Sequence, residues 1–225
     1  KITVLLAKAL IEKVFSKNFY KIDNENELDL FNKSDAKIPY FILESCKGMD
    51  IENLKYERIW EEAPLPVDNP ENAFRVILGD FVTTEDGTGI VHTAPTFGAD
   101  DYKAAKSAVP EVPPLQVLDK KGNKVPLVDL KGKFIDNIGL ISGKYVKNEY
   151  YESNSIPDKS VDVEIAIKLK EQNLAFKVEK YSHSYPHCWR TDKPVLYYPM
   201  ESWFIKISNL SERMFTLNKA VSYTH

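Results

Sequence analysis

Short apolar runs between turn residues constrain the fold of this chain more than any other feature of its sequence. From residue 38 to residue 94 the runs are rich in β-branched and aromatic residues, a pattern typical of strands. Prolines punctuate the region, so we expect many short strands and no long ones. The predicted strands here are Ile38–Leu43, Phe74–Leu78, Phe81–Thr84 and Gly89–Thr93, with Pro39, Pro64, Pro66 and Pro70 among them.

Further strands and a hairpin are predicted downstream. Leu115–Leu118 and Lys124–Val128 flank the turn Lys121-Gly122-Asn123, a sequence typical of a hairpin. Phe176–Lys180, Val195–Tyr198 and Trp203–Ile207 also have strand-like composition.

Helical spacing marks four segments: Ile2–Lys17, Asp100–Ser107, residues 161–173 and Asn209–Lys219. The third segment is ambiguous, because its apolar residues alternate as in a strand. Ser160 is a good N-cap, and the length and composition of the run favour a helix ending near Asn173. Short strands mixed with scattered helices predict an α+β fold with peripheral helices around a small β-barrel.

Composition excludes several classes of protein. The chain has 225 residues, of which 43% are hydrophobic and 28% charged, values typical of a globular domain and not of a disordered chain. Its two cysteines exclude a disulfide scaffold, and no apolar run has the length of a membrane span. We therefore expect a cytoplasmic protein with no membrane partner. Because the sequence starts at Lys1 rather than Met, we expect a piece of a longer chain.

Charge is unevenly distributed although the net charge is only −3. Residues 44–71 hold eight acidic and three basic residues, and residues 102–133 hold seven lysines and three acids. Residues 168–193 hold six basic residues and three acids. Basic stretches of this kind can bind an anionic partner, and they are also common as ordinary solvated surface. We expect the two basic stretches to face nucleic acid and the acidic stretch to face away.

Three of the nine glycines lie within twelve residues, at Gly87, Gly89 and Gly98. The pair Asp86-Gly87 predicts a tight turn, followed by a short strand that carries His92 and by a helix that starts at Asp100 and Asp101. This bend can gather backbone amides, an imidazole and a carboxylate around one cavity. In the simpler interpretation an aspartate caps the helix and His92 is an ordinary strand residue.

Several motifs in this order resemble isoleucyl-tRNA synthetases. The stretch from Val82 to Asp101, with its Gly-Ile-Val-His core, is similar to the editing signature of this family. Three later motifs resemble its return path to the catalytic core: Lys144-Tyr145-Val146, residues 183–190 and residues 201–205. The resemblance implies an editing domain over residues 1–185, lacking the family's upstream threonine-rich strand, and a return segment over residues 186–225.

Post-transfer editing is the activity that this resemblance implies. The family is the standard example of limited discrimination, because one methylene in an apolar pocket is worth only about 1–3 kcal/mol. A second and smaller pocket therefore hydrolyses Val-tRNA(Ile). The implied partners are the valine-carrying 3′ end of tRNA(Ile) and the rest of the synthetase chain. No cofactor is implied for this segment, since ATP and magnesium serve only the catalytic domain.

Site roles follow from the same resemblance. Asp101 matches the carboxylate that binds the substrate's α-ammonium group and positions the ester for attack. His92 matches the histidine that limits the size of the side-chain cavity. Thr93 and Phe97 are weaker candidates, for the pocket wall or for the terminal adenosine. The family's adenylate-forming motifs, His-x-Gly-His and Lys-Met-Ser-Lys-Ser, are absent from this sequence.

His183, His187 and Cys188 are candidate zinc ligands that lie close together in the sequence. Two of the three ligands are adjacent, which makes a poor tetrahedral set, so no metal is predicted. Three other functions stay open: a tRNA-binding module without catalysis, an inert structural fragment, and a small-molecule hydrolase in which His92 acts as a general base with Asp101.

Overall fold

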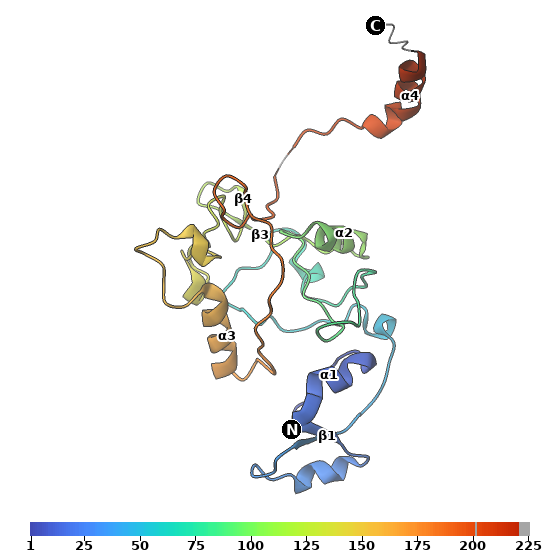
Figure 1. Ribbon diagram of the computed structural model, residues 1–225, viewed down its shortest axis with the longest axis vertical. Helices are drawn as coiled ribbons and strands as arrows, with labels where there is room; N and C mark the ends of the chain where they lie inside the picture. The colour runs from blue at the N-terminus through green and yellow to red at the C-terminus, as the bar shows by residue number, and fades with distance from the viewer. Residues whose placement is uncertain (201, 221–225) are drawn as a thin grey trace.

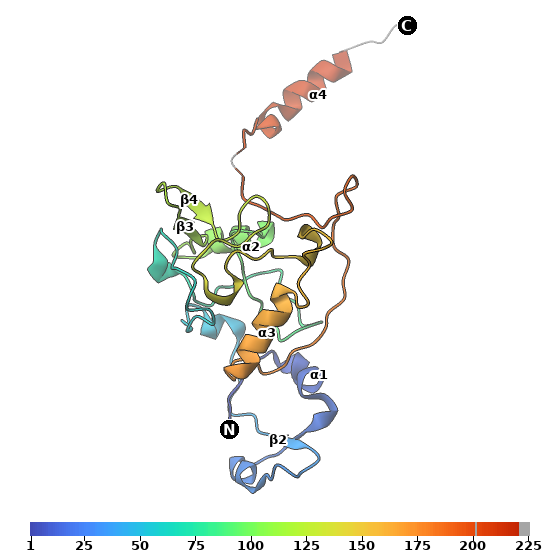
Figure 2. The same ribbon diagram turned by 90° about the vertical axis from the view of Figure 1, so that its left-hand side faces the viewer.

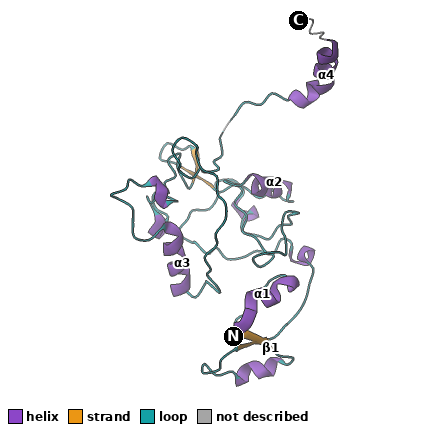
Figure 3. Ribbon diagram, viewed as in Figure 1, coloured by secondary structure: helices purple, strands orange, loops and turns teal. Residues whose placement is uncertain are grey.

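Loops make up most of the computed structural model, which describes residues 1–200 and 202–220 (Figures 1 and 3). The α-helices are α1 (Ile11–Phe15), α2 (Ala99–Ser107), α3 (Val161–Glu171) and α4 (Ser211–Ala220). The strands are β1 (Phe19–Lys21), β2 (Ile38–Tyr40), β3 (Gln116–Leu118) and β4 (Lys124–Pro126). Short 3-10 turns occupy Lys8–Leu10, Ser16–Asn18, Glu25–Leu30, Gly48–Ile51, Pro70–Asn72, Gly139–Ile141, Asn148–Tyr150 and Ile207–Leu210.

The described residues form two separate two-stranded sheets. β1 pairs in parallel with β2, with Tyr20 opposite Pro39. β3 and β4 form the predicted antiparallel hairpin, with Val117 opposite Val125. Gly122 takes a positive φ of 82° in its turn. The backbone amides of Lys121 and Asn123 donate to the Asp119 carboxylate. The hydrogen bonds from Asn123 hold the pKa of Asp119 below its usual value.

The prediction of mixed helices and strands is confirmed, but the described residues form no closed barrel. A barrel needs strands that pair continuously around a ring. Here each named strand has three residues. Elsewhere the pairing is reduced to single bridges, at Lys55–Arg75, Val128–Phe134, Lys133–Tyr145 and His187–Pro194.

Strands are found within three of the predicted runs: 38–43 and the two hairpin runs, 115–118 and 124–128. The other predicted strands are wrong. Phe74 has a positive φ of 54°, which breaks the extended run at its first residue and leaves only the Arg75 bridge. Gly89, at a φ of 77°, bends the next run, so residues 90–93 form a loop. Residues 81–84, 176–180, 195–198 and 203–206 also lie outside regular strands.

The predicted helices over 100–107, 161–173 and 209–219 are confirmed with small shifts at their ends, and the one over 2–17 is present only in part, as α1 with a 3-10 turn on each side. The N-terminal helix begins only after Ala7, because the Ala7 amide donates to the Thr88 carbonyl at 2.7 Å and holds Ala7 extended. In α3 the Ser160 hydroxyl accepts from the Val163 amide at 3.4 Å, as the capping pattern predicts. Asn209 lies in the 3-10 turn that precedes α4.

A small core lies beneath α3. Ile138, Ile141 and Val161 are buried there and pack against Trp60, Ala63, Leu127, Phe134, Ile135 and Ile165. The Trp60 indole donates to the Ile138 carbonyl at 2.9 Å. Lys168 pairs with Glu62 and lies 3.9 Å above the Trp60 ring, so α3 is tied to residues 60–62. These contacts join segments that are far apart in the sequence.

The chain exposes much more surface than a compact protein of its mass. Its accessible surface is 18088 Å², whereas a compact monomer of this mass exposes about 10,500 Å². Helix α4 contributes to the excess, because it lies apart from the central body in both views (Figures 1 and 2) and has no buried residue. The domain boundary near residue 185 stays a prediction. Glu201 and residues 221–225 of the predicted return segment lie outside the described residues.

Candidate functional site

The turn over residues 85–89 is held against the N-terminal segment. Gly87 and Gly89 have φ values of 70° and 77°, which side-chain-bearing residues rarely adopt. A Cβ at Gly89 would overlap the Cβ of Ala7. Lys13 donates to the Glu85 carbonyl at 2.9 Å and pairs with Asp86. The turn predicted at Asp86-Gly87 is therefore present, although no strands flank it.

A tight bend follows the turn and leads into α2. The amides of Phe97 and Gly98 both donate to the Ala94 carbonyl at 3.0 Å. Gly98 is the N-cap residue of α2, and Asp100 and Asp101 lie in the first helical turn. Negative charge at this end of a helix is favoured by the helix dipole. Neither aspartate occupies the N-cap position itself.

Asp101 is turned back across the bend. Its Oδ2 accepts from the Ala94 amide at 3.1 Å. A Cβ at Gly98 would overlap the Asp101 carboxylate, so glycine at this position permits its close approach. No protein donor binds Oδ1 within the described part of the chain. Asp100, by contrast, is exposed and pairs with Lys103 at 3.1 Å.

The other predicted site residues are less closely joined. His92 lies on an exposed loop rather than on a strand, and Thr93 and Phe97 are half-buried. The Phe97 ring packs edge-on against Tyr198, with centroids 6.1 Å apart. Across the described residues, no hydrogen bond connects His92 with Asp101.

Thr96 is a buried residue of this bend that the sequence does not single out. It is only 7% exposed, and its hydroxyl donates to the Leu115 carbonyl at 3.4 Å. The contact ties the bend to the segment that leads into β3. No signal in the sequence distinguishes Thr96 from the nearby Thr93.

No family model matches the chain. An isoleucine--tRNA ligase of Cytophaga hutchinsonii is 49% identical, covering 99% of the chain and 20% of the ligase. The chain is homologous to isoleucine--tRNA ligases. Those of Bacteroides fragilis and Clostridium tetani are 46% and 38% identical, covering 99% and 92% of the chain and 20% and 18% of the ligases.

The chain thus spans about a fifth of the length of the isoleucine--tRNA ligases that it matches. Isoleucine--tRNA ligase is another name for isoleucyl-tRNA synthetase. These relatives therefore confirm the resemblance that the sequence motifs indicate. The matched region includes nearly every residue of the chain, so it extends well beyond the bend around Asp101.

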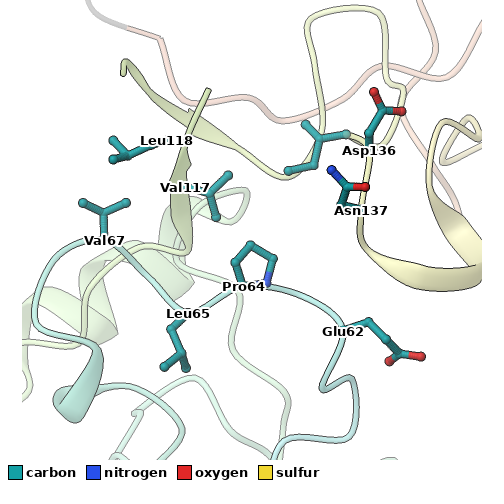
Figure 4. Close-up of a pocket in the computed structure, with 9 residues that line it drawn as sticks. Glu62, Pro64, Leu65, Val67, Val117, Leu118, Asp136 and Asn137 are labelled. Carbon is teal, nitrogen blue, oxygen red and sulfur yellow. The ribbon is translucent and has the colours of Figure 1, made fainter. Parts of the chain in front are cut away.

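One cavity of the structure lies away from the bend. It has a volume of about 430 Å³ and lies beside β3 (Figure 4). Apolar side chains occupy one side of it, and Glu62, Asp136 and Asn137 lie on the other. The lining residues are Glu62, Pro64, Leu65, Val67, Val117, Leu118, Ile135, Asp136 and Asn137. None of the four predicted site residues is among them.

The acidic stretch 44–71 contacts both basic stretches through ion pairs, while the expectation that the basic stretches face nucleic acid stays a prediction. Lys124, from the first basic stretch, pairs with Asp68 of the acidic stretch at 2.6 Å. Lys168, from the second, pairs with Glu62, and this contact holds the pKa of Glu62 below its usual value. Opposite charges from distant segments therefore neutralise one another locally, while Lys120 and Lys121 at the hairpin remain exposed.

Residues 186–195 form a narrow turn around Cys188. The Cys188 amide donates to the Lys193 carbonyl at 2.8 Å, and a hydrogen bond with the Thr191 side chain lowers the pKa of the thiol. In the described portion of the chain, no group of three or more His, Cys, Asp or Glu side chains is arranged to hold a metal ion. No helix within residues 1–200 or 202–220 is long and apolar enough to cross a membrane.

Proposed function

We propose that this chain serves post-transfer editing within an isoleucyl-tRNA synthetase, by hydrolysing the ester of Val-tRNA(Ile). The observation that carries the proposal is the Asp101 carboxylate, which the Ala94 amide orients through Oδ2. Oδ1 is thereby left for a ligand. Homology to isoleucine--tRNA ligases supplies the substrate class, because such ligases act on tRNA.

The α-ammonium group of the attached amino acid suits Asp101. A charge-assisted hydrogen bond from the α-ammonium group to Oδ1 of Asp101 would hold the adjacent ester in a fixed position beside the bend. Every aminoacyl-tRNA carries this cation, so Asp101 recognises the class of substrate. His92, with Thr93 and Phe97 beside it, is proposed to limit the side chain that fits, admitting valine and excluding isoleucine.

Orientation supplies most of the rate in this proposal. The oxygen of a water molecule forms a bond with the ester carbonyl carbon. The bond from that carbon to the ribose oxygen then breaks, and the ribose oxygen takes the proton that the attacking water gives up. The products are free valine and uncharged tRNA(Ile). The wider proposal includes a cytoplasmic location and the rest of the synthetase as partner, with ATP and magnesium bound only by its catalytic domain.

Deacylation of Val-tRNA(Ile) tests the anchor role of Asp101, in this chain and in a full-length synthetase that contains it. Asp101→Asn keeps the shape but removes the charge, so we expect a loss of about 100-fold or more in deacylation, with aminoacylation near normal. Asp100→Asn is the matched control, because Asp100 is exposed and pairs only with Lys103. Hydrolysis by Asp101→Asn at the parental rate would contradict the proposal. Binding of tRNA without any deacylation would favour the non-catalytic binding module.

Substrate size tests the role of His92. His92→Ala enlarges the proposed cavity, so we expect hydrolysis of Ile-tRNA(Ile) to appear while valine hydrolysis remains measurable. Rates on both substrates are compared in one assay. Loss of both activities in a folded variant would instead identify His92 as a general base.

A further inference from the structure

An aromatic ladder follows α3 and takes no part in the site described above. We define it as Tyr181, His183, Tyr185 and His187, which alternate along a segment without regular secondary structure. The centroids of successive rings lie 5.3, 6.1 and 6.3 Å apart. The first pair is stacked and the other two pairs are edge-to-face, so each ring touches the next and the four form one continuous row.

Hydrogen bonds within the chain orient three of the four ladder rings. The Tyr185 hydroxyl donates to the Val195 carbonyl at 2.9 Å. Nδ1 of His183 lies 3.0 Å from the Ser184 carbonyl, and Nδ1 of His187 lies 2.9 Å from the Tyr185 carbonyl. Hydrogen bonds thus hold His183, Tyr185 and His187, so the row beside Tyr181 is already ordered before a ligand binds, which favours binding.

Both ends of the ladder, Tyr181 and His187, are exposed, and so is the nearby Trp189. Tyr181 is 74% exposed, and Trp189, which lies two residues beyond His187, is 83% exposed. The Arg190 guanidinium covers one face of Trp189 at 4.3 Å from the ring centroid. Both rings therefore present aromatic surface to solvent.

Cations accompany the rings. Nζ of Lys147 lies 4.3 Å above the Tyr185 ring, and Arg190 lies over Trp189. Neither cation forms an ion pair with a carboxylate in the described part of the chain. The surrounding stretch, residues 168–193, carries twice as many basic as acidic residues. Aromatic rings with adjacent cations are the combination that binds single-stranded nucleic acid, through base stacking and phosphate contacts.

We infer that the ladder and Trp189 form a platform for unpaired nucleotides of RNA. Because the ladder rings already touch one another, bases stack on the open faces of Tyr181 and Trp189 rather than between the rings. Lys147 and Arg190 are placed to hold phosphates. The six residue steps from Tyr181 to His187 span at most about 20 Å, which accommodates a few nucleotides. The inference deepens the proposed function, on which it rests for the source of the RNA, because the aminoacyl end of tRNA is unpaired.

Binding of a short labelled single-stranded RNA, measured by fluorescence anisotropy over a range of salt concentrations, tests the platform. The single strand is expected to bind more tightly than a duplex of the same sequence. The double variant Tyr181→Ala/Trp189→Ala is expected to weaken binding about tenfold without changing the salt slope, since stacking carries no charge. Lys147→Met is expected to lower that slope by about one. Tyr20→Ala is the matched control, because Tyr20 is an exposed tyrosine outside the ladder.

Three outcomes would overturn the platform: duplex binding as tight as single-strand binding, unchanged affinity in the double variant, or an equal loss in Tyr20→Ala. Circular dichroism checks that each variant is folded. The same measurements in a full-length synthetase show whether the rest of that protein covers the ladder. If it does, the double variant will not change RNA binding by the full-length synthetase. That result would also contradict the inference. Asp101→Asn separates the two proposals, because it is expected to abolish deacylation while leaving binding of the single strand unchanged.

Discussion

Helices α3 and α4 carry similar local signals and have opposite surroundings. Each has an acidic residue in its first turn and a lysine in its last turn. In α3, Val161 is buried and Ile165 packs against the core. None of the α4 residues is buried, and Phe215 is 62% exposed. Local signals are therefore sufficient to predict both helices, whereas tertiary packing holds only α3 in the body.

This contrast has an energetic consequence. A helix of about ten residues is marginal in water by itself. Helix α3 gains from apolar burial and from the ion pairs Lys144–Glu164 and Lys168–Glu62. Helix α4 has local contacts such as Lys219 above the Phe215 ring at 4.4 Å. Substitutions in and around α3 should therefore affect global stability, while those on α4 should not.

The largest expected effect is on the core beneath α3. Ile138 is 1% exposed, so Ile138→Ala should lower the free energy of unfolding by about 3 kcal/mol, through lost burial and an unfilled cavity. Phe215→Ala on α4 is the matched control and should change it by about 0.5 kcal/mol or less. Urea denaturation followed by circular dichroism measures both. Equal losses in the two variants would show that α4 is packed as firmly as α3.

A smaller effect is expected at the start of α3. Ser160→Ala removes the side-chain acceptor for the Val163 amide and should cost about 0.5 to 1 kcal/mol, the low end of the range because that contact is 3.4 Å long. Ser160→Asn restores an acceptor and should recover most of the loss. If Ser160→Asn is as unstable as Ser160→Ala, the cap does not stabilise α3.

The smallest expected effect concerns pH. Lys168 lowers the pKa of Glu62 in the folded chain, so the stabilisation is present above the unfolded pKa of about 4.3 and is lost as pH falls through the folded value. Between about pH 5 and pH 3, the parent chain should lose more stability than Lys168→Met. The difference should stay below about 1 kcal/mol, because the Glu62 side chain is 44% exposed.

Lys170→Met serves as the control for this measurement, since Lys170 is an exposed lysine on the same helix. It should retain the pH dependence of the parent chain. An identical dependence in Lys168→Met would mean that the Glu62–Lys168 pair adds nothing to stability in acid.

The predicted site shows how far the sequence alone leads. Its motifs identify Asp101, and the start of α2 beside it follows from the local pattern. The contact from the Ala94 amide to Asp101 and the close approach at Gly98 emerge only when the bend is built. The half-buried position of Phe97 against Tyr198 depends on a residue about a hundred positions away. The family resemblance names the residues, and the structure shows which of them lie together.

What the sequence by itself determined are the elements whose stabilising hydrogen bonds are local. These are α2, α3, α4 and the β3–β4 hairpin, where caps, turn glycines and spacing act within a few residues. The predicted strands at 74–78 and 89–93 are absent, because a strand needs a pairing partner from elsewhere in the chain. The positive φ values of Phe74 and Gly89 also interrupt the extended backbone there. Only the tertiary structure decided the ion pairs between distant residues. Glu62 pairs with Lys168, 106 residues away, and Asp68 pairs with Lys124, 56 residues away. Such pairings depend on how the whole chain closes on itself, which no local pattern specifies.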